Sequence, residues 1–141
     1  MLKKTDELNF ELENTQCVHG YITSNDSEFD DKVFCKFFNS LIDRCGKSKT
    51  KIAADACISE PYLYEIIRGV KRPTRNIVIK LAFALGSSLE TTERLMMLAG
   101  HSSFYVRHKR DSLLKYAFQN GLSISEADSL LVEYGFSVMT E

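Results

Sequence analysis

The sequence predicts an all-α protein, with one small domain and an appendage. Apolar residues recur at the spacing of one helix face along most of the chain after residue 30. Glycine follows the last apolar residue of several of these stretches, which is a typical place for a helix to end. No stretch pairs alternating strand residues with a hairpin turn. The chain has 141 residues, of which 44% are hydrophobic and 26% charged, as in ordinary globular proteins.

Residues 1–30 are expected to form a short, poorly structured and acidic arm. Leu8, Phe10 and Leu12 alternate with polar residues, which is typical of either a short strand or a docking segment. Gly20 and the polar run 24–27 indicate loop. The arm holds two lysines and seven acids, a net charge of −5, whereas residues 31–141 hold sixteen basic and twelve acidic residues, a net of +4. Basic charge on a small module favours a polyanion partner, although a solvated surface explains it equally well.

Residues 31–100 are expected to form a five-helix domain. The first helix presents an apolar face from Val33 to Cys45 and ends at Gly46. Ser48 and Ser59 are expected to cap the second and third helices, and Pro61 fits the first turn of the third. The five helices are predicted at about 33–45, 49–56, 60–68, 75–85 and 90–99.

Residues 101–141 are expected to add a helical hairpin, with helices at about 110–120 and 125–134. Residues 75–86 and 110–121 coincide at Arg, Lys, Ala, Phe and Gly positions, which indicates one hairpin repeated in tandem. Chance similarity between two amphipathic hairpins is the alternative. We expect the second hairpin to stack on the first, and a leftover apolar face with Phe136 and Val138 to dimerise the protein. The competing interpretation is that it only extends the core, or binds an effector or partner.

The most informative stretch is Ser48–Thr74, where a tight turn separates two short predicted helices. Two such helices cross at a steep angle, so that the second can enter a DNA major groove while the first crosses the backbone. The small residues Ala53 and Ala56 permit a close crossing, and apolar side chains fill the space between the helices.

Over about Phe34–Leu98 the sequence resembles the Cro and lambda-repressor-like helix-turn-helix family, also called the xenobiotic-response-element family. The resemblance implies a lambda-repressor-like fold and a transcriptional regulator, more specifically a repressor, which binds duplex DNA as a homodimer. The matching residues are Ile52-Ala53, Ile58-Ser59, Tyr62-Leu63, Ile66, Arg68-Gly69, Lys71-Arg72-Pro73, Leu81-Ala82 and Ala84-Leu85-Gly86.

Three positions depart from the family pattern. The second helix often begins with Gln, where this chain has Lys49, which can still reach a phosphate. The turn glycine is replaced by Cys57, so that a left-handed backbone there would be strained. An acidic position after Ile66 is occupied by Ile67, an apolar residue that needs cover.

The resemblance places the candidate DNA contacts on and around the recognition helix, about Glu60–Arg68. Glu can accept a hydrogen bond from cytosine N4 in the major groove. The alternative is that Tyr62 is partly core and Glu65 a solvated helix residue. Groove-facing residues are Glu60, Pro61, Tyr62, Tyr64 and Glu65; Lys49, Arg68, Lys71 and Arg72 are expected on phosphates, and Thr50 and Ser59 complete the predicted site.

The acidic groove face and arm favour a second function: a helix-turn-helix scaffold that binds a protein partner, as an antitoxin-like or anti-repressor module. The partner would bind the N-terminal arm or the C-terminal hairpin. An enzyme is not expected, because His19, His101 and His108 lack partners at a useful spacing and no phosphate-binding glycine loop is present. We therefore name no catalytic residue, cofactor or metal.

The four cysteines form no CxxC pair, which favours reduced thiols in a cytoplasmic protein. A zinc site using Cys17, His19 and a distant cysteine is the alternative, but its spacing matches no familiar pattern. The longest apolar runs are too short to cross a membrane, and no apolar signal region follows Lys3 and Lys4. A cytoplasmic location without membrane contact is therefore expected.

Overall fold

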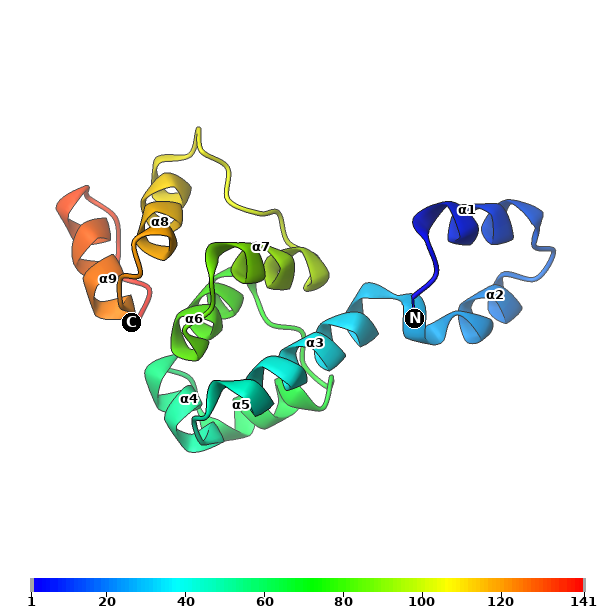
Figure 1. The fold of residues 1–141 in the computed structure, drawn as a ribbon, viewed down its shortest axis with the longest axis horizontal. Coiled ribbons are helices and arrows are strands. Elements are labelled where there is room, and N and C mark those ends of the chain that lie inside the picture. Colours follow the sequence, from blue (N-terminus) through cyan, green and yellow to red (C-terminus); the bar gives the residue numbers. More distant parts are fainter. Residues whose placement is uncertain (1, 141) are drawn as a thin grey trace.

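The computed structural model describes residues 2–140, which form nine α-helices and one 3-10 turn without a strand. Figure 1 shows a helical body, a two-helix arm projecting from one end of it, and a helical hairpin at the other end. The all-α class expected from the sequence is confirmed.

The N-terminal arm is helical, and the prediction of a poorly structured segment was wrong in this respect. It consists of α1 (Thr5–Asn14), α2 (Val18–Ser24) and the 3-10 turn η1 (Asp26–Glu28). Neither α1 nor α2 has a buried residue. Helical periodicity arises because one face of a helix meets a core, and α1 has no core to face. The apolar residues of α1 could therefore alternate like those of a strand.

A cluster of polar side chains holds the parts of the arm together. Lys3 Nζ donates to Glu11 Oε1 at 2.6 Å and to Asn25 Oδ1 at 2.7 Å. Asn25 is only 1% exposed, and its Nδ2 donates a hydrogen bond to Glu11 Oε2 at 2.9 Å. The hydrogen bond from Lys3, then that from Asn25, lowers the pKa of Glu11. The start of the chain is thereby joined to α1 and to the end of α2.

The five helices of the body begin and end within a few residues of the predicted positions. They are α3 (Asp30–Cys45), α4 (Lys49–Asp55), α5 (Glu60–Ile67), α6 (Arg75–Leu85) and α7 (Leu89–Leu98). The Ser48 and Ser59 side chains accept hydrogen bonds from Lys51 N and Tyr62 N, as expected of N-caps. The buried side chains of their common core include Phe34, Phe38, Ile42, Ile52, Leu63, Ile66, Val78, Ile79, Leu95 and Met96.

The C-terminal hairpin, α8 (Lys109–Gln119) and α9 (Ile124–Glu133), packs on the hairpin of α6 and α7, with α9 against α6 and α8 against α7. Phe83 and Phe118 stack with ring centroids 4.0 Å apart and an interplanar angle of 22°. These two residues occupy the same position of the tandem repeat, as do Ala82 and Ala117, both fully buried. The expected stacking of the two hairpins is therefore present.

An ion pair ties the two hairpins together at their first helices. Arg75 Nη1 and Nη2 donate to the two carboxylate oxygens of Asp111 at 3.0 and 2.9 Å. The same guanidinium binds the carbonyls of Ser102 and Ser103 in the connecting loop, at 3.0 and 3.1 Å. Burial alone would raise the pKa of Asp111, but hydrogen bonds from Arg75 and from Tyr105 N outweigh it and lower the pKa.

The C-terminal tail folds back onto α9. Asp128 accepts hydrogen bonds from Met139 N at 2.8 Å and from Thr140 Oγ1 at 2.6 Å. Met139 is buried, and Phe136 packs against the core. Phe136 and Val138, which were expected on a leftover apolar face, are half-buried, so that part of each side chain already packs within the chain. Dimerisation through this face stays a prediction.

Candidate nucleic-acid interface

Four residues, Ala56 to Ser59, connect α4 to α5. Ala53 and Ala56 are buried where the helices meet, as expected of a close crossing. The Ile58 N–H donates to the Ala53 carbonyl at 3.0 Å and closes the end of α4. Cys57 has a φ of 56°, the only positive φ of a residue other than glycine between residues 2 and 140. The predicted left-handed backbone is present, and the side chain of Cys57 makes it strained.

The helix α5 has one buried face and one exposed face. Leu63 and Ile66 are fully buried and fix the helix on the body. Tyr64 is 43% exposed, and Glu60 and Pro61 are exposed at the start of the helix. The predicted groove-facing residues therefore fall into two groups, one exposed and one partly buried. Glu60, Pro61 and Tyr64 lie on the outer face, whereas Tyr62 packs partly against the core and Glu65 is half-buried.

Two hydroxyl residues of the predicted site lie at the starts of α4 and α5. Ser59 accepts a hydrogen bond from Tyr62 N at 3.2 Å, so that its oxygen is used while its O–H can still donate outwards. Thr50 is exposed in the first turn of α4. Both positions are open to a nucleic acid lying against α5.

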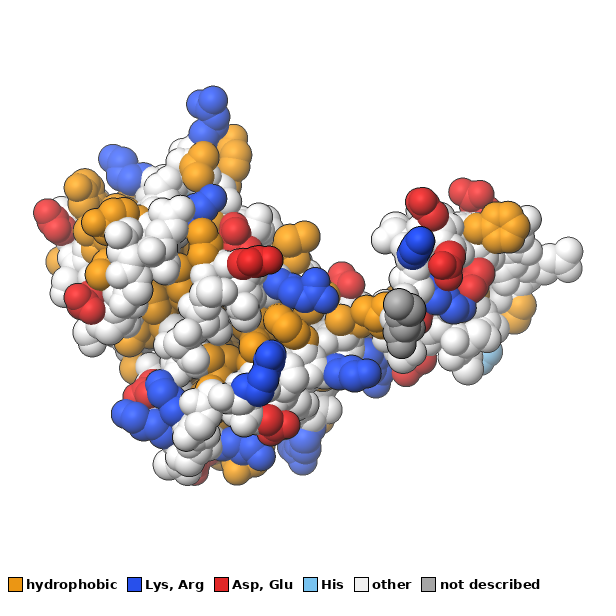
Figure 2. All heavy atoms as spheres, viewed as in Figure 1, with side chains coloured by type: hydrophobic (Ala, Val, Ile, Leu, Met, Phe, Trp, Pro, Cys, Tyr) orange, Lys and Arg blue, Asp and Glu red, His pale blue; other side chains and the backbone are white. Residues whose placement is uncertain are grey.

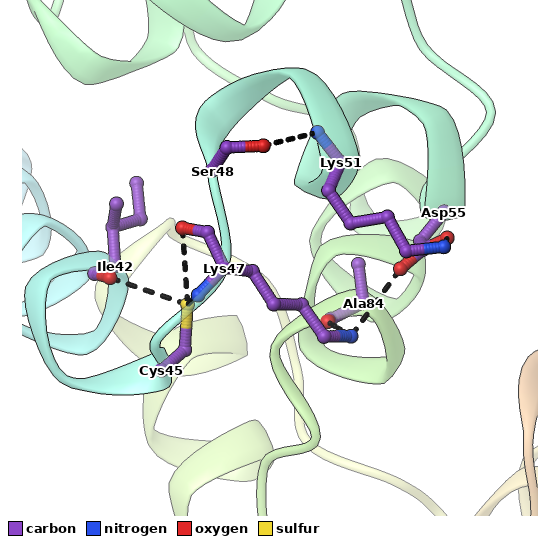
Figure 3. Close-up of polar contacts among 7 residues, drawn as sticks. All are labelled: Ile42, Cys45, Lys47, Ser48, Lys51, Asp55 and Ala84. Atoms are coloured by element: carbon purple, nitrogen blue, oxygen red, sulfur yellow. Dashed lines mark hydrogen bonds and ion pairs between the residues drawn. The ribbon is translucent and has the colours of Figure 1, made fainter.

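Figure 3 shows that two lysines around the start of α4 converge on one acid, Asp55. Lys51 Nζ lies 2.9 Å and Lys47 Nζ 3.3 Å from the Asp55 carboxylate. Lys47 also donates to the Ala84 carbonyl at 2.6 Å, which joins the start of α4 to the end of α6. The hydrogen bond from Lys51 is the main cause of the lowered pKa of Asp55. Asp55 thus offsets one of the two positive charges that Lys47 and Lys51 bring to the start of α4.

Lys49 is placed differently from these two lysines. Its ammonium group lies over the ring of Tyr64, 5.5 Å from the centroid. This cation–π contact brings the first residue of α4 beside the outer face of α5. Lys49 is exposed, so its charge remains available to a phosphate next to the groove-facing residues.

The other predicted cations follow α5. Arg68 and Lys71 are exposed on either side of Gly69, in a turn closed by hydrogen bonds from Val70 N and Lys71 N to the Glu65 carbonyl. Arg72 points towards the end of α7, where its Nε donates to the Ala99 carbonyl at 3.2 Å. A Cβ at Gly100 would lie 2.7 Å from Arg72 Nη2, so that glycine leaves the room for this contact. Arg72 therefore has a structural role besides the expected phosphate contact.

A cleft of about 800 Å³ lies between these cations and the base of the arm. One wall carries Arg68, Lys71 and Arg72, and acidic residues including Glu28 and Asp31 line the cleft as well. The acidic arm therefore borders the basic flank of α5.

A family model described as helix-turn-helix matches residues 40–91, which span the end of α3 to the first turn of α7. This is the segment whose two crossing helices, exposed outer face and flanking cations are described above. The chain carries a helix-turn-helix domain, similar to those of the Cro and lambda-repressor family. Helix-turn-helix domains are DNA-binding regulators, and the second of their two crossing helices, the position that α5 has in this domain, is termed the recognition helix. No curated protein and no solved structure matches the chain.

Between residues 2 and 140, no cluster of three His, Cys, Asp or Glu side chains is arranged to hold a metal ion. No helix in that range is long and apolar enough to cross a membrane.

Sequence reasoning missed the neutralising role of Asp55, although its spacing of four residues from Lys51 was a visible signal. It correctly singled out Ile67 as needing cover. This side chain packs against the core, and Asn39 Nδ2 donates to the Ile67 carbonyl at 3.3 Å.

Proposed function

We propose that the protein is a sequence-specific regulator of transcription, a repressor that places α5 in the major groove of duplex DNA. The observation that carries this proposal is the outer face of α5, where Glu60, Pro61 and Tyr64 are exposed. Lys49 lies over the Tyr64 ring, and Arg68 and Lys71 follow the helix. Contacts to phosphates position such a helix, and contacts to base edges give specificity.

The proposed contacts follow from where each side chain lies. Lys49, Arg68 and Lys71 bind phosphates, and Thr50 and Ser59 donate hydroxyl hydrogen bonds to the backbone of the same strand. Glu60 and Glu65 accept hydrogen bonds from bases, for which cytosine N4 is the matching donor. Tyr64 supplies apolar contact. Tyr62 and Arg72 contribute mainly by holding α5 and the turn that follows it.

We further propose that two copies act together on a two-fold operator, as two recognition helices on one face of DNA require. A function on the chromosome fits the cytoplasmic location expected from the sequence.

The test compares Lys49→Ala with Lys51→Ala, two exposed lysines of α4 that differ in their contacts. Phosphate contacts release counterions, so the logarithm of affinity falls linearly with the logarithm of salt concentration. Lys49→Ala should weaken binding to mixed duplexes and flatten this slope by about one unit. Lys51→Ala should leave the slope nearly unchanged, because Asp55 already neutralises that lysine. Equal slopes for wild type and Lys49→Ala would contradict the docking.

The second candidate function is protein binding by the same scaffold. The acidic residues Glu60 and Glu65 on the recognition helix and the net charge of the arm favour it. Absence of duplex binding at 50 mM salt by the folded, full-length protein would favour this second function over the first.

A further inference from the structure

The arm exposes apolar side chains that nothing in the described part of the chain covers. Phe10 on α1 is 67% exposed and Val18 on α2 is 63% exposed, and Leu12 and Ile22 are exposed as well. The arm meets the body through η1 and α3, whereas α1 and α2 contact each other. A two-helix segment without a buried apolar core gains little stability from its own packing. Its exposed side chains therefore mark a surface for another molecule.

A second exposed apolar surface, of opposite charge, lies on the loop before α8. Tyr105 and Val106 are exposed at its tip, the latter by 62%, and Arg107 and Lys109 are exposed next to them. Residues 101–110 contain three Lys or Arg residues and no acid. In Figure 2 this loop stands out from the body as a projection that carries hydrophobic and basic side chains.

Hydrogen bonds hold this loop in its projecting shape. Tyr105 N donates to Asp111 Oδ2 at 2.9 Å, Ser112 Oγ to the Val106 carbonyl at 2.6 Å, and His108 N to the Tyr105 carbonyl at 3.0 Å. The Tyr105 and His108 rings meet edge to face with centroids 4.9 Å apart. A loop ordered in advance loses little conformational entropy when it binds.

We infer that the acidic arm of one copy binds the basic loop Tyr105–Arg110 of a second copy, and that the second arm binds the first loop in return. The arm has a net charge of −5, so two arms facing each other would repel, whereas arm and loop attract. Arm and loop project from separate parts of the body in Figure 1. A reciprocal exchange closes a two-fold dimer with two identical contacts.

This contact presupposes the two-copy complex proposed above and names the surface that forms it. The experiment uses the full-length protein without DNA, so that association is measured apart from DNA binding. Light scattering and sedimentation at micromolar concentration should show a dimer, which weakens in 0.5 M salt because exposed charges are screened.

Two charge-reversal variants test the partners of the contact. The first carries Arg107→Glu and Lys109→Glu on the loop, and the second carries Glu7→Lys and Glu13→Lys on the arm. All four residues are exposed, and none belongs to the Lys3–Glu11–Asn25 cluster. Each variant alone should dimerise at least about tenfold more weakly than wild type. The loop variant changes the net charge of residues 101–110 from +3 to −1, so that it repels the acidic arm, and the arm variant lowers the net charge of the arm from −5 to −1, which removes most of its attraction to the loop.

Mixing the two variants should restore dimers. In the mixed pair, the native arm of the loop variant meets the native loop of the arm variant. At the second contact, the introduced lysines of the other arm meet the introduced glutamates of the other loop. A control for the loop variant, Lys36→Glu with Arg44→Glu on the exposed side of α3, changes the net charge by the same −4 and should dimerise like wild type. Circular dichroism of every variant checks that the helices are retained.

Three results would overturn the inference: a wild-type monomer at micromolar concentration, a dimer that neither variant weakens, or two monomeric variants that stay monomeric when mixed. Duplex binding by a wild-type monomer would also overturn it while leaving the DNA-binding proposal intact. A wild-type dimer that does not bind duplex DNA would contradict the DNA-binding proposal and leave the arm–loop contact intact.

Discussion

Arg75 and Asp111, the first residue of α6 and a first-turn residue of α8, are joined by two parallel hydrogen bonds of 3.0 and 2.9 Å. The Asp111 side chain is only 8% exposed and that of Arg75 25%. This pair, with the loop carbonyls that Arg75 also binds, fixes the second hairpin on the first.

Replacing Asp111 by Ala should destabilise the protein by about 3 kcal/mol, because the mutation leaves the Arg75 guanidinium partly buried without its carboxylate. Urea denaturation measures the change. Asp43→Ala serves as control, since Asp43 is exposed on α3, and it should change stability by less than about 0.5 kcal/mol. Equal effects of the two substitutions would contradict the role assigned to the pair.

Asp111 should also contribute to acid unfolding. Its pKa in the folded protein is lowered from the ordinary value of 3.8, so its contribution to stability is fully present above pH 3.8. That contribution is lost as the pH falls through the lowered pKa. Asp111→Asn should therefore flatten the dependence of the unfolding free energy on pH below 3.8, as measured by urea denaturation at a series of pH values. An unchanged slope would contradict this prediction.

Phe83 and Phe118 should be energetically coupled. Each replacement by Ala should cost about 3 kcal/mol, because both rings leave a cavity between the hairpins. The double variant should cost less than the sum of the single ones by about 1 kcal/mol, the usual coupling of a stacked aromatic pair. Tyr116→Ala, on the exposed side of α8, is the control. Strict additivity would show that the stacking contributes no coupling energy.

Cys57→Gly should stabilise the protein. A left-handed residue with a side chain costs about 1 kcal/mol more than glycine, and the strain at a φ of 56° would be relieved. The melting temperature should rise by a few degrees. The converse control is Gly86→Ala, which introduces a side chain at a φ of 67° and should lower the melting temperature. A lower melting temperature for Cys57→Gly would contradict the strain.

Base recognition by the recognition helix is tested by Glu60→Gln and Glu65→Gln. Each exchange turns an acceptor-only group into one that also donates, so the preferred base at the contacted position should change. Selection from random duplexes measures the preference. Because Glu60 is exposed and Glu65 half-buried, the larger change is expected for Glu60. Identical selected sequences for wild type and both variants would exclude base contacts by these acids.

The sequence was most informative where local chemistry decides the structure. The hydroxyls of Ser48 and Ser59 cap helices whatever lies around them, and Gly46 and Gly86 end helices because they adopt the left-handed backbone easily. The repeat spacing also placed Phe83 and Phe118 at equivalent positions. The helix bounds of residues 30–133 could be predicted on these grounds.

Contacts between distant segments could not be predicted in the same way. Arg75 and Asp111 are 36 residues apart, and nothing in either local sequence marks the other as its partner. The contact between Lys49 and Tyr64 depends on the crossing of α4 and α5, and that between Arg72 and Ala99 depends on the turn after α5. The helices of the arm were missed because their apolar residues face solvent.

The stacking of Phe83 on Phe118 limits where the chain can be divided without exposing its core. The domain was expected to end at residue 100. The hydrophobic core nevertheless includes residues beyond that position, among them Leu114, Phe118 and Met139. A chain ending at Gly100 would leave Phe83 facing water and Arg75 without its acid. Residues 30–140 therefore form the smallest exchangeable module. Chimeras that graft this recognition helix onto another regulator should join at the start of α3 and retain everything after it.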